Sequence, residues 1–119
     1  MNVSETELAQ RASDRNARRV TPADIQDVIV SAHYFTAAQG ADSTRPFGAA
    51  WPEQTYQSLG LLTLCVLVLR NGFTVTGESA CADPAMFDAD IRRDLARLDA
   101  ERKVWSLLGY ALRCELSNT

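Results

Sequence analysis

The pattern of apolar and polar positions changes period along the chain and predicts helix, strand, strand and helix, in that order. The first helical face consists of Ile25, Val28, Ile29, Ala32 and Phe35. Ahead of it, Thr21, Pro22 and Asp24 supply a capping hydroxyl, a proline at the first helical position and an acid three residues after the cap. Gly40 is a natural end. We therefore predict a helix over residues 22–38.

The middle of the chain has the period of a strand. Residues 64–69 are apolar at every position, and residues 73–76 alternate apolar with polar. Asn71 and Gly72 between them tolerate the positive φ that a type I′ turn requires at both central positions. The pattern predicts an antiparallel hairpin that turns at Asn71 and Gly72. Because the first strand is apolar on both faces, we expect it to be covered on both sides or to be central in a sheet.

A long helical stripe follows Asp83 and Pro84, which again combine a cap residue with proline at the first helical position. The stripe, interrupted by Arg102, consists of Phe87, Ile91, Leu95, Leu98, Trp105, Leu108, Leu112 and Leu116. We expect Trp105 to lie in the core. The opposite face holds ion-pair spacings, namely Asp88 with Arg92, Asp99 with Lys103, Asp90 with Arg93 and Asp94 with Arg97.

The segment between the first helix and the hairpin is rich in residues that interrupt regular structure. Residues 39–60 contain three glycines and two prolines, and residues 53–59 form a short helix at most. The segment also carries Phe47, Trp51 and Tyr56. A loop of this length is unusual in a compact domain and is often functional. Its aromatic residues have two interpretations, because they either fix the loop to the core or contact a partner.

Together these elements predict an α+β fold. We expect a small single domain with helix–hairpin–helix order, a two-stranded antiparallel sheet and a long C-terminal helix over residues 21–119, preceded by a flexible arm over residues 1–20. Two strands alone are marginally stable in water, and the doubly apolar strand leaves an edge that must be covered. We therefore expect a homodimer with the last helix or the strand edge at the two-fold axis.

Composition narrows the class of protein. The chain has 119 residues, 46% of them hydrophobic and 23% charged, which is typical of one globular domain. Its net charge of −3 argues against a general nucleic-acid binder. We see neither a long apolar run that would cross a membrane nor the apolar core of a signal peptide, so we expect no membrane association and a cytoplasmic location.

Candidate chemistry is sparse. Cys65, Cys81 and Cys114 are an odd number without metal-site spacing, and we expect reduced structural thiols, no metal and no cofactor. His33 is the single histidine. A cluster of Glu78, Ser79 and Cys81 beside it would be needed for nucleophilic catalysis, but no spacing establishes a base or an oxyanion site. We expect no catalytic residues and no enzyme.

Three segments carry a family resemblance. TPADIQDVIVSAHYFTAAQG at residues 21–40, LTLCVLVLRNGFTVTGESACADPAMFDADI at residues 62–91 and KVWSLLGYALR at residues 103–113 resemble a family of small tailed-phage and prophage proteins, named after early gene products of a coliphage and a Shigella podophage. The family commonly has a glycine after the position of Ile91, where this chain has Arg92. The resemblance implies an origin in a phage or prophage and a non-structural accessory role. It carries over no catalytic residues.

These observations favour a protein that binds a host or anti-phage-defence protein and does no chemistry. The predicted binding residues are the aromatic anchors Phe47, Trp51 and Tyr56, with a polar rim at Arg92 and Arg93. The alternative is a nucleic-acid-binding regulatory protein. It would use Arg92, Arg93 and Arg97 together with the arginines of residues 11–19, although interleaved acids would weaken its attraction for phosphate.

Overall fold

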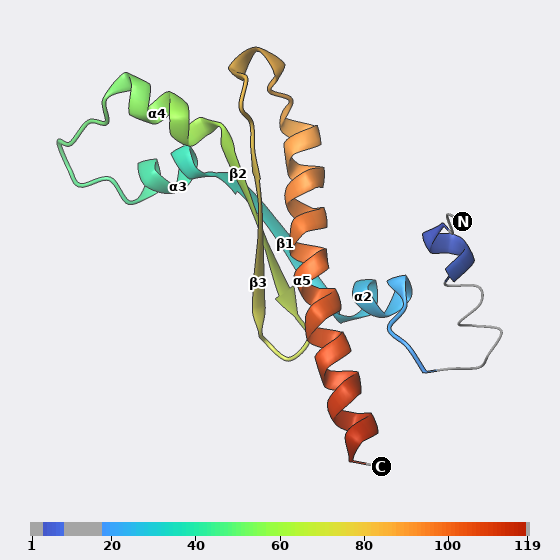
Figure 1. Ribbon diagram of the computed structural model, residues 1–119. Coiled ribbons are helices and arrows are strands. Elements are labelled where there is room, and N and C mark those ends of the chain that lie inside the picture. Colours follow the sequence, from blue (N-terminus) through green and yellow to red (C-terminus); the bar gives the residue numbers. More distant parts are fainter. Residues whose placement is uncertain (1–3, 9–17, 119) are drawn as a thin grey trace.

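Figure 1 shows the computed structural model of the protein, which describes residues 4–8 and 18–118. The elements from residue 22 onward are α2 (Pro22–Val28), β1 (Ile29–Thr36), α3 (Ala37–Ser43), α4 (Glu53–Gly60), β2 (Leu62–Leu69), β3 (Thr74–Ala80), the 3₁₀ turn η1 (Pro84–Met86) and α5 (Ala89–Ser117). They form one small α+β domain with a long C-terminal helix, as predicted. The flexible arm predicted for residues 1–20 falls largely outside the described residues and stays a prediction.

The strands form one antiparallel sheet in which β2 lies between β1 and β3. In the middle of the sheet Leu67 of β2 stands between Ala32 of β1 and Val75 of β3. The central position of β2 confirms one of the two environments expected for a strand that is apolar on both faces. The prediction of two strands is wrong, because β1 is a third strand that pairs with the free edge of β2.

The predicted helix over residues 22–38 is correct only for its first two turns. Its start is confirmed, since Asp24 N–H donates to Thr21 Oγ1 at 3.2 Å and Thr21 N–H donates to Asp24 Oδ2 at 2.9 Å. The chain then leaves the helix at Ile29 and continues as β1. Ile29 and Val30 are β-branched, which favours a strand, and the edge of β2 offers backbone groups that only another strand can pair. Strand pairing therefore overrides the helical spacing.

The predicted hairpin joins β2 to β3, but its turn begins one residue earlier. Gly72 N–H donates to the Leu69 carbonyl at 2.9 Å, which makes Arg70 and Asn71 the central turn residues. Gly72 follows with φ at 88°, and Leu69 N–H donates to the Phe73 carbonyl at 2.8 Å. This is the three-residue hairpin loop with a glycine bulge. Glycine is thus required at 72, whereas Asn71 accepts a hydrogen bond from Phe73 N–H at 3.0 Å.

Helix α5 lies across one face of the sheet and packs against β3 and β2 (Figure 1). Its inner face, which we define as Ala96, Ala100 and Val104, is fully buried. A Cβ atom built on Gly77 of β3 would lie 2.1 Å from the Ala96 carbonyl oxygen and 2.7 Å from Ala100 Cβ. The helix can approach the strand this closely only because all three positions are small. The same core includes Ile25, Cys65, Leu67, Leu69 and Val75.

The predicted stripe of the last helix does not face the sheet. Helix α5 begins at Ala89, where Asp88 accepts hydrogen bonds from two backbone N–H groups of the first turn. Asp83, the predicted cap, instead caps η1. Trp105 remains 39% exposed, so its assignment to the core of this chain is wrong. Small residues lie under the helix. Leu108 of the stripe packs against the edge of the core, whereas Ile91, Leu95, Leu98 and Trp105 are exposed.

The molecule is elongated, with extents of 61 × 36 × 19 Å and a Cα radius of gyration of 18.8 Å. A compact chain of this length would have a radius of gyration of about 13–14 Å. Three described parts lie away from the centre of the sheet, namely the pair of helices α3 and α4, the C-terminal turns of α5 and residues 4–8 (Figure 1). Much apolar surface therefore stays outside the core.

Candidate interaction surfaces

Helices α3 and α4 pack on each other and extend from one end of the sheet (Figure 1). We call residues 37–60 the α3–α4 extension. Helix α3 begins with a capping box, in which Gln39 N–H donates to Thr36 Oγ1 at 3.2 Å and Thr36 N–H donates to Gln39 Oε1 at 2.9 Å. The helix predicted at residues 53–59 is confirmed as α4. The irregular part of this segment is therefore shorter than predicted and is limited to residues 44–52.

Phe47 occupies the tip of the α3–α4 extension. Ala49 N–H donates to the Pro46 carbonyl at 3.0 Å, and Gly48 has φ at 79°. These are the features of a type II turn with Phe47 at its second position. The Phe47 side chain is fully exposed, so the interpretation that it fixes the loop to the core is wrong. Trp51 is also exposed, although less so than Phe47.

Tyr56 joins the two helices of the extension. Its hydroxyl donates to Asp42 Oδ2 at 3.1 Å, and the same carboxylate lies 3.7 Å from Arg45 Nη1. The hydrogen bond to Asp42 raises the pKa of Tyr56, and the negative charge of Asp42 adds a smaller increase. Tyr56 therefore orients α4 on α3, and its ring stays 41% exposed.

Arg92 and Arg93, the predicted polar rim, have different environments. Arg92 Nη1 donates to Ser79 Oγ at 3.2 Å and to the Ala80 carbonyl at 3.3 Å, so it fixes α5 to the end of β3. Its Nε is buried and has no hydrogen-bond partner within the described part of the chain. Arg93 forms an ion pair with Asp90 and borders a cavity. Of the two, Arg93 is the more accessible to a partner.

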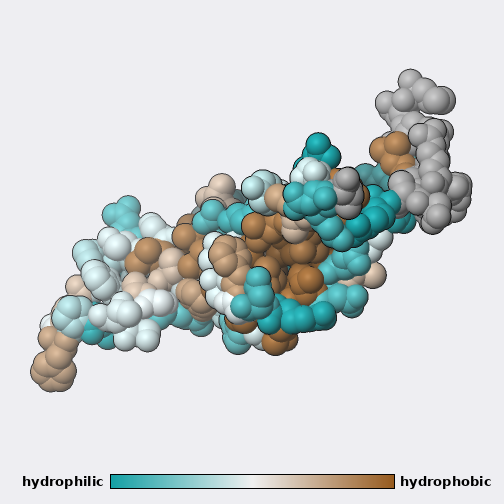
Figure 2. All heavy atoms as spheres, turned by 90° about the horizontal axis from the view of Figure 1, so that it is seen from below, coloured by the Kyte–Doolittle hydropathy of each residue, from teal (hydrophilic) through white to brown (hydrophobic). Residues whose placement is uncertain are grey.

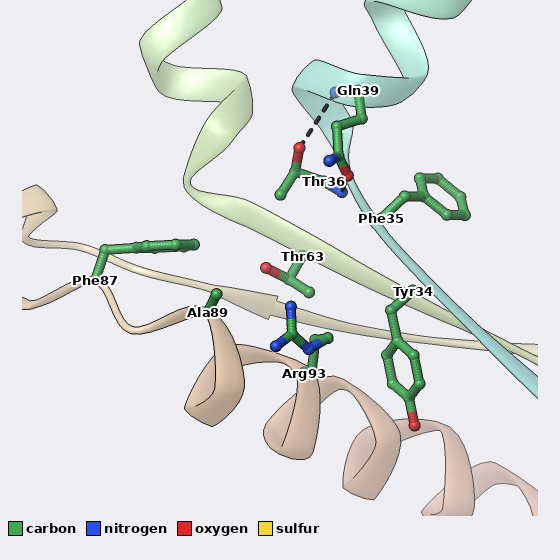
Figure 3. A pocket seen from close by; sticks show the side chains of 8 residues that line it. All are labelled: Tyr34, Phe35, Thr36, Gln39, Thr63, Phe87, Ala89 and Arg93. Atoms are coloured by element: carbon green, nitrogen blue, oxygen red, sulfur yellow. Dashed lines mark hydrogen bonds between the residues drawn. The ribbon is translucent and has the colours of Figure 1, made fainter.

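The cavity beside Arg93 has a volume of about 210 Å³ and lies where α5, the ends of β1 and β2 and the start of α3 meet (Figure 3). Its lining consists of Tyr34, Phe35, Thr36, Gln39, Thr63, Phe87, Ala89 and Arg93. Thr63 is 3% exposed, and none of the described residues forms a hydrogen bond with its hydroxyl. Figure 3 shows the Arg93 guanidinium pointing toward Thr63, between Phe87 and Tyr34. These groups can hold a small polar group, but they include no nucleophile paired with a base.

Arg97 forms a network that the sequence did not predict. Its guanidinium donates to Gln26 Oε1 at 3.0 Å, to Glu101 Oε2 at 3.2 Å and to the Tyr34 hydroxyl at 3.5 Å. Hydrogen bonding to Tyr34 and Glu101 raises the pKa of Arg97. The network connects α5 with α2 and β1. Tyr34 and Gln26 are 63 and 71 residues away from Arg97 in the sequence. The network therefore could not be predicted without the positions of α2 and β1 in the fold.

The ion pairs of α5 also differ in part from the predicted ones. Arg93 pairs with Asp90 as predicted, whereas Arg97 pairs with Glu101 in place of Asp94. Asp99 accepts a hydrogen bond from Glu78 N–H of β3 at 3.0 Å. The arginines that the nucleic-acid alternative requires on α5 are thus engaged in other contacts. Of the arginines of residues 11–19, Arg11 and Arg15 lie outside the described residues, whereas Arg18 lies 3.0 Å from Glu115 Oε1.

The residues considered for catalysis do not come together. His33 and Ser79 belong to rows of the sheet that point to opposite faces, since His33 stands opposite Val66 and Ser79 stands opposite Thr63. His33 instead hydrogen-bonds Ser31 Oγ at 3.0 Å. Cys81 Sγ donates to the Asp83 carbonyl at 3.2 Å. In the described ranges, the acids, histidine and cysteines include no group that could hold a metal ion.

A second exposed apolar surface runs along the side of α5 that faces away from the sheet. We define the outer row as Ile91, Leu95, Leu98, Arg102, Trp105, Gly109 and Leu112. Leu98 and Trp105 also border a groove with residues 19–22. Figure 2 views the molecule from below, onto the end that carries the hairpin turn and the C-terminal turns of α5, and shows hydrophobic side chains gathered between polar ones on this end of the molecule. Within the described residues, no helix is long and apolar enough to cross a membrane.

These features define a small α+β protein with exposed apolar surfaces. Residues 20–116 match the profile of the phage protein family of N4 Gp49 and phage Sf6 gene 66, and the chain therefore belongs to this family. The match confirms the family predicted from the three sequence segments. No curated protein and no solved structure matches the chain.

Proposed function

We propose that this protein is a phage accessory protein that binds a host or anti-phage-defence protein without doing chemistry. The phage family supports the accessory role. The observation that carries the binding role is Phe47, a large aromatic side chain that a type II turn holds fully exposed at the tip of the α3–α4 extension. Exposing such a ring to water is unfavourable, and aromatic anchors dominate interface energies.

Trp51 and Tyr56 complete the proposed contact surface. The hydrogen bond from Tyr56 to Asp42 holds α4 on α3, so the aromatic side chains are presented by a preorganised turn and helix. Preorganisation lowers the entropic cost of association. Arg93, whose side chain is partly exposed beside the start of α3, adds a polar contact near the base of the extension.

Nucleic-acid binding is less well supported. Arg93 and Arg97 each have an acidic partner, and Arg92 donates to Ser79 and Ala80. Paired arginines offer little charge for neutralising phosphates, which supply most of the affinity in nucleic-acid complexes. The acidic net charge of −3 acts in the same direction.

The test is affinity enrichment of the tagged full-length protein from a bacterial host, with quantitative mass spectrometry. Wild type is compared with Phe47→Ser and with Trp51→Ser. We expect wild type to enrich a small set of host proteins. The enrichment of these proteins should be at least tenfold lower with either variant. Phe73→Ser is the matched control, because Phe73 is another exposed phenylalanine but lies in the hairpin loop.

Two outcomes would overturn the proposed function. The first is equal enrichment by all four proteins, which would show that the extension does not make the contact. The second is nucleic acid that copurifies with wild type, detected by the ratio of absorbance at the nucleic-acid and protein maxima. That result would favour the regulatory alternative instead.

We place this activity in the bacterial cytoplasm and assign it to a homodimer. The elongated shape and the exposed outer row of α5 support self-association. Of the two surfaces predicted for the two-fold axis, α5 is better supported than the edge of the doubly apolar strand, since β1 and β3 already pair with both edges of β2.

A further inference from the structure

The outer row of α5 has the spacing of a coiled-coil seam. Its members, from Ile91 to Leu112, follow one another at intervals of four, three, four, three, four and three residues. This alternation keeps side chains on one seam between paired helices. The inner face of the same helix, at Ala96, Ala100 and Val104, is already occupied by the sheet. Part of the row borders a groove with Glu5 and residues 19–22, and its remaining exposed surface is available to a second helix.

Four large side chains of the row are unusually exposed for their size. Ile91 is 51% exposed, Leu95 41%, Leu98 42% and Trp105 39%. With about 200 Å² for each whole side chain, they leave roughly 350 Å² of apolar surface per copy. Two copies would bury about 700 Å² of it, and since interfaces are a little over half apolar, the total would reach roughly 1,200 Å². That is the lower limit for a specific protein interface.

We propose that the outer row binds the outer row of a second copy of this chain in antiparallel orientation. This inference specifies the surface of the proposed homodimer. The two-fold axis passes between Arg102 and Trp105, so that each Arg102 lies against Trp105 of the second copy. A guanidinium over an indole ring is a favourable cation–π contact. In an isologous interface of this kind every contact occurs twice, because the two-fold axis repeats it.

The next residue pairs along the proposed seam are also complementary in size. Leu98 meets Gly109 of the second copy, so a large side chain fills the space that glycine leaves. Leu95 meets Leu112 of the second copy. A parallel arrangement would instead place Arg102 against Arg102 and Gly109 against Gly109, which combines like charges with a void. The sequence of the row thus selects the antiparallel arrangement.

The charges that flank the seam are partly neutralised within each copy. Antiparallel pairing brings Asp94 near Glu115 of the second copy, and Arg92 near Arg113. Glu115 already lies 3.0 Å from Arg18 Nη2, and Arg92 donates to Ser79 and Ala80. Because the seam is apolar and the flanking charges are alike, we expect added salt to leave the dimer unchanged or to strengthen it.

Orientation is tested by chemical cross-linking of the full-length chain in a Cys114→Ser background, which removes the exposed thiol and keeps the buried Cys65 and Cys81. One variant carries Leu98→Cys and the other Gly109→Cys. A short bis-maleimide should join the two variants when they are mixed, and should join neither variant to itself. Cross-linking of each variant alone would show parallel pairing, and no cross-linking in any sample would exclude this seam. Either result overturns the inference.

Affinity is tested by sedimentation equilibrium from low to high micromolar concentration. Leu98→Lys should weaken dimerisation at least tenfold. Tyr110→Lys is the control, because Tyr110 is 75% exposed on the same helix but lies outside the outer row. A wild-type monomer over the whole range would overturn the inference, and would indicate that the chain's own N-terminal residues cover the row. Enrichment of a host protein through Phe47 would still stand in that case, so the two proposals fail separately.

Discussion

The two faces of α5 use hydrophobic residues in opposite ways. The inner face is fully buried and carries only Ala96, Ala100 and Val104, whereas the outer row carries Leu98 and Trp105 and is exposed. Distance explains the difference, because Gly77 brings the backbones of β3 and α5 too close for large side chains. In this helix, residue size and not hydrophobicity alone determines which face meets the sheet.

The largest effect is expected at the tight contact. Gly77→Val should lower the free energy of unfolding by more than about 3 kcal/mol or prevent folding, because the new side chain would collide with the backbone of α5. Urea denaturation measures the change. Gly60→Ala is the control, since a Cβ atom there meets nothing within 4 Å. A Gly77→Val protein as stable as wild type would show that the helix lies farther from the sheet.

A smaller effect separates two neighbouring residues of α5. Val104→Ala should destabilise by roughly 1–3 kcal/mol, because the side chain is fully buried. Trp105→Ala should cost less than about 1 kcal/mol in dilute solution, where the chain is monomeric. Thermal and urea unfolding at low protein concentration test both. The reverse order would mean that the inner and outer faces are assigned incorrectly.

The flank of α5 next to β3 should show an effect of about 1 kcal/mol. Asp99→Ala removes the acceptor for Glu78 N–H and should destabilise by that amount. Asp94→Ala, which changes an exposed acid on the same helix, should leave the unfolding midpoint in urea nearly unchanged. Equal midpoints for the two variants would argue against a structural role for Asp99.

The smallest effect concerns thiol reactivity and leaves stability unchanged. Cys65 lies fully buried beneath α5, and burial raises the pKa of its thiol, so little thiolate forms near neutral pH. Cys114 is exposed on the far part of the helix. Ellman's reagent should therefore modify one thiol rapidly in the folded protein and three after denaturation. Rapid modification of Cys65 in the native protein, identified by mass spectrometry, would mean that the inner face opens easily.

Local signals predicted much of this fold. The capping box at Thr21, the glycine requirement at Gly72 and the helix α4 depend on residues close in sequence, and each is present. The central position of β2 followed from its apolar residues on both faces. The partner β1 was missed, because residues 25–35 also match a helical period and only the exposed edge of β2 decides between the two structures.

The candidate site was predictable to a lesser degree. The aromatic residues of the α3–α4 extension could be selected from the sequence, since large side chains stand among glycine and proline there. The separation of Arg92 from Arg93 could not, because adjacent residues of a helix point about 100° apart and their neighbours come from different strands. Most of the outer row was recognised as a stripe on a helix that could lie at a dimer axis, but Trp105 was assigned to the core, since hydrophobicity alone does not distinguish the inside of a domain from a seam.

Helix α5 is longer than the sheet that it covers. Its 29 residues span about 43 Å, whereas a strand of eight residues spans about 26 Å, so the C-terminal turns extend beyond the sheet (Figure 1). The contact of Ala96 and Ala100 with Gly77 fixes the middle of the helix on β3. Near the start of the helix Arg92 donates to Ser79 and Ala80 at the end of β3, and near its C-terminus Glu115 pairs with Arg18. One continuous helix therefore connects the end of β3 with the segment that precedes α2 and acts as a rigid support along the whole domain.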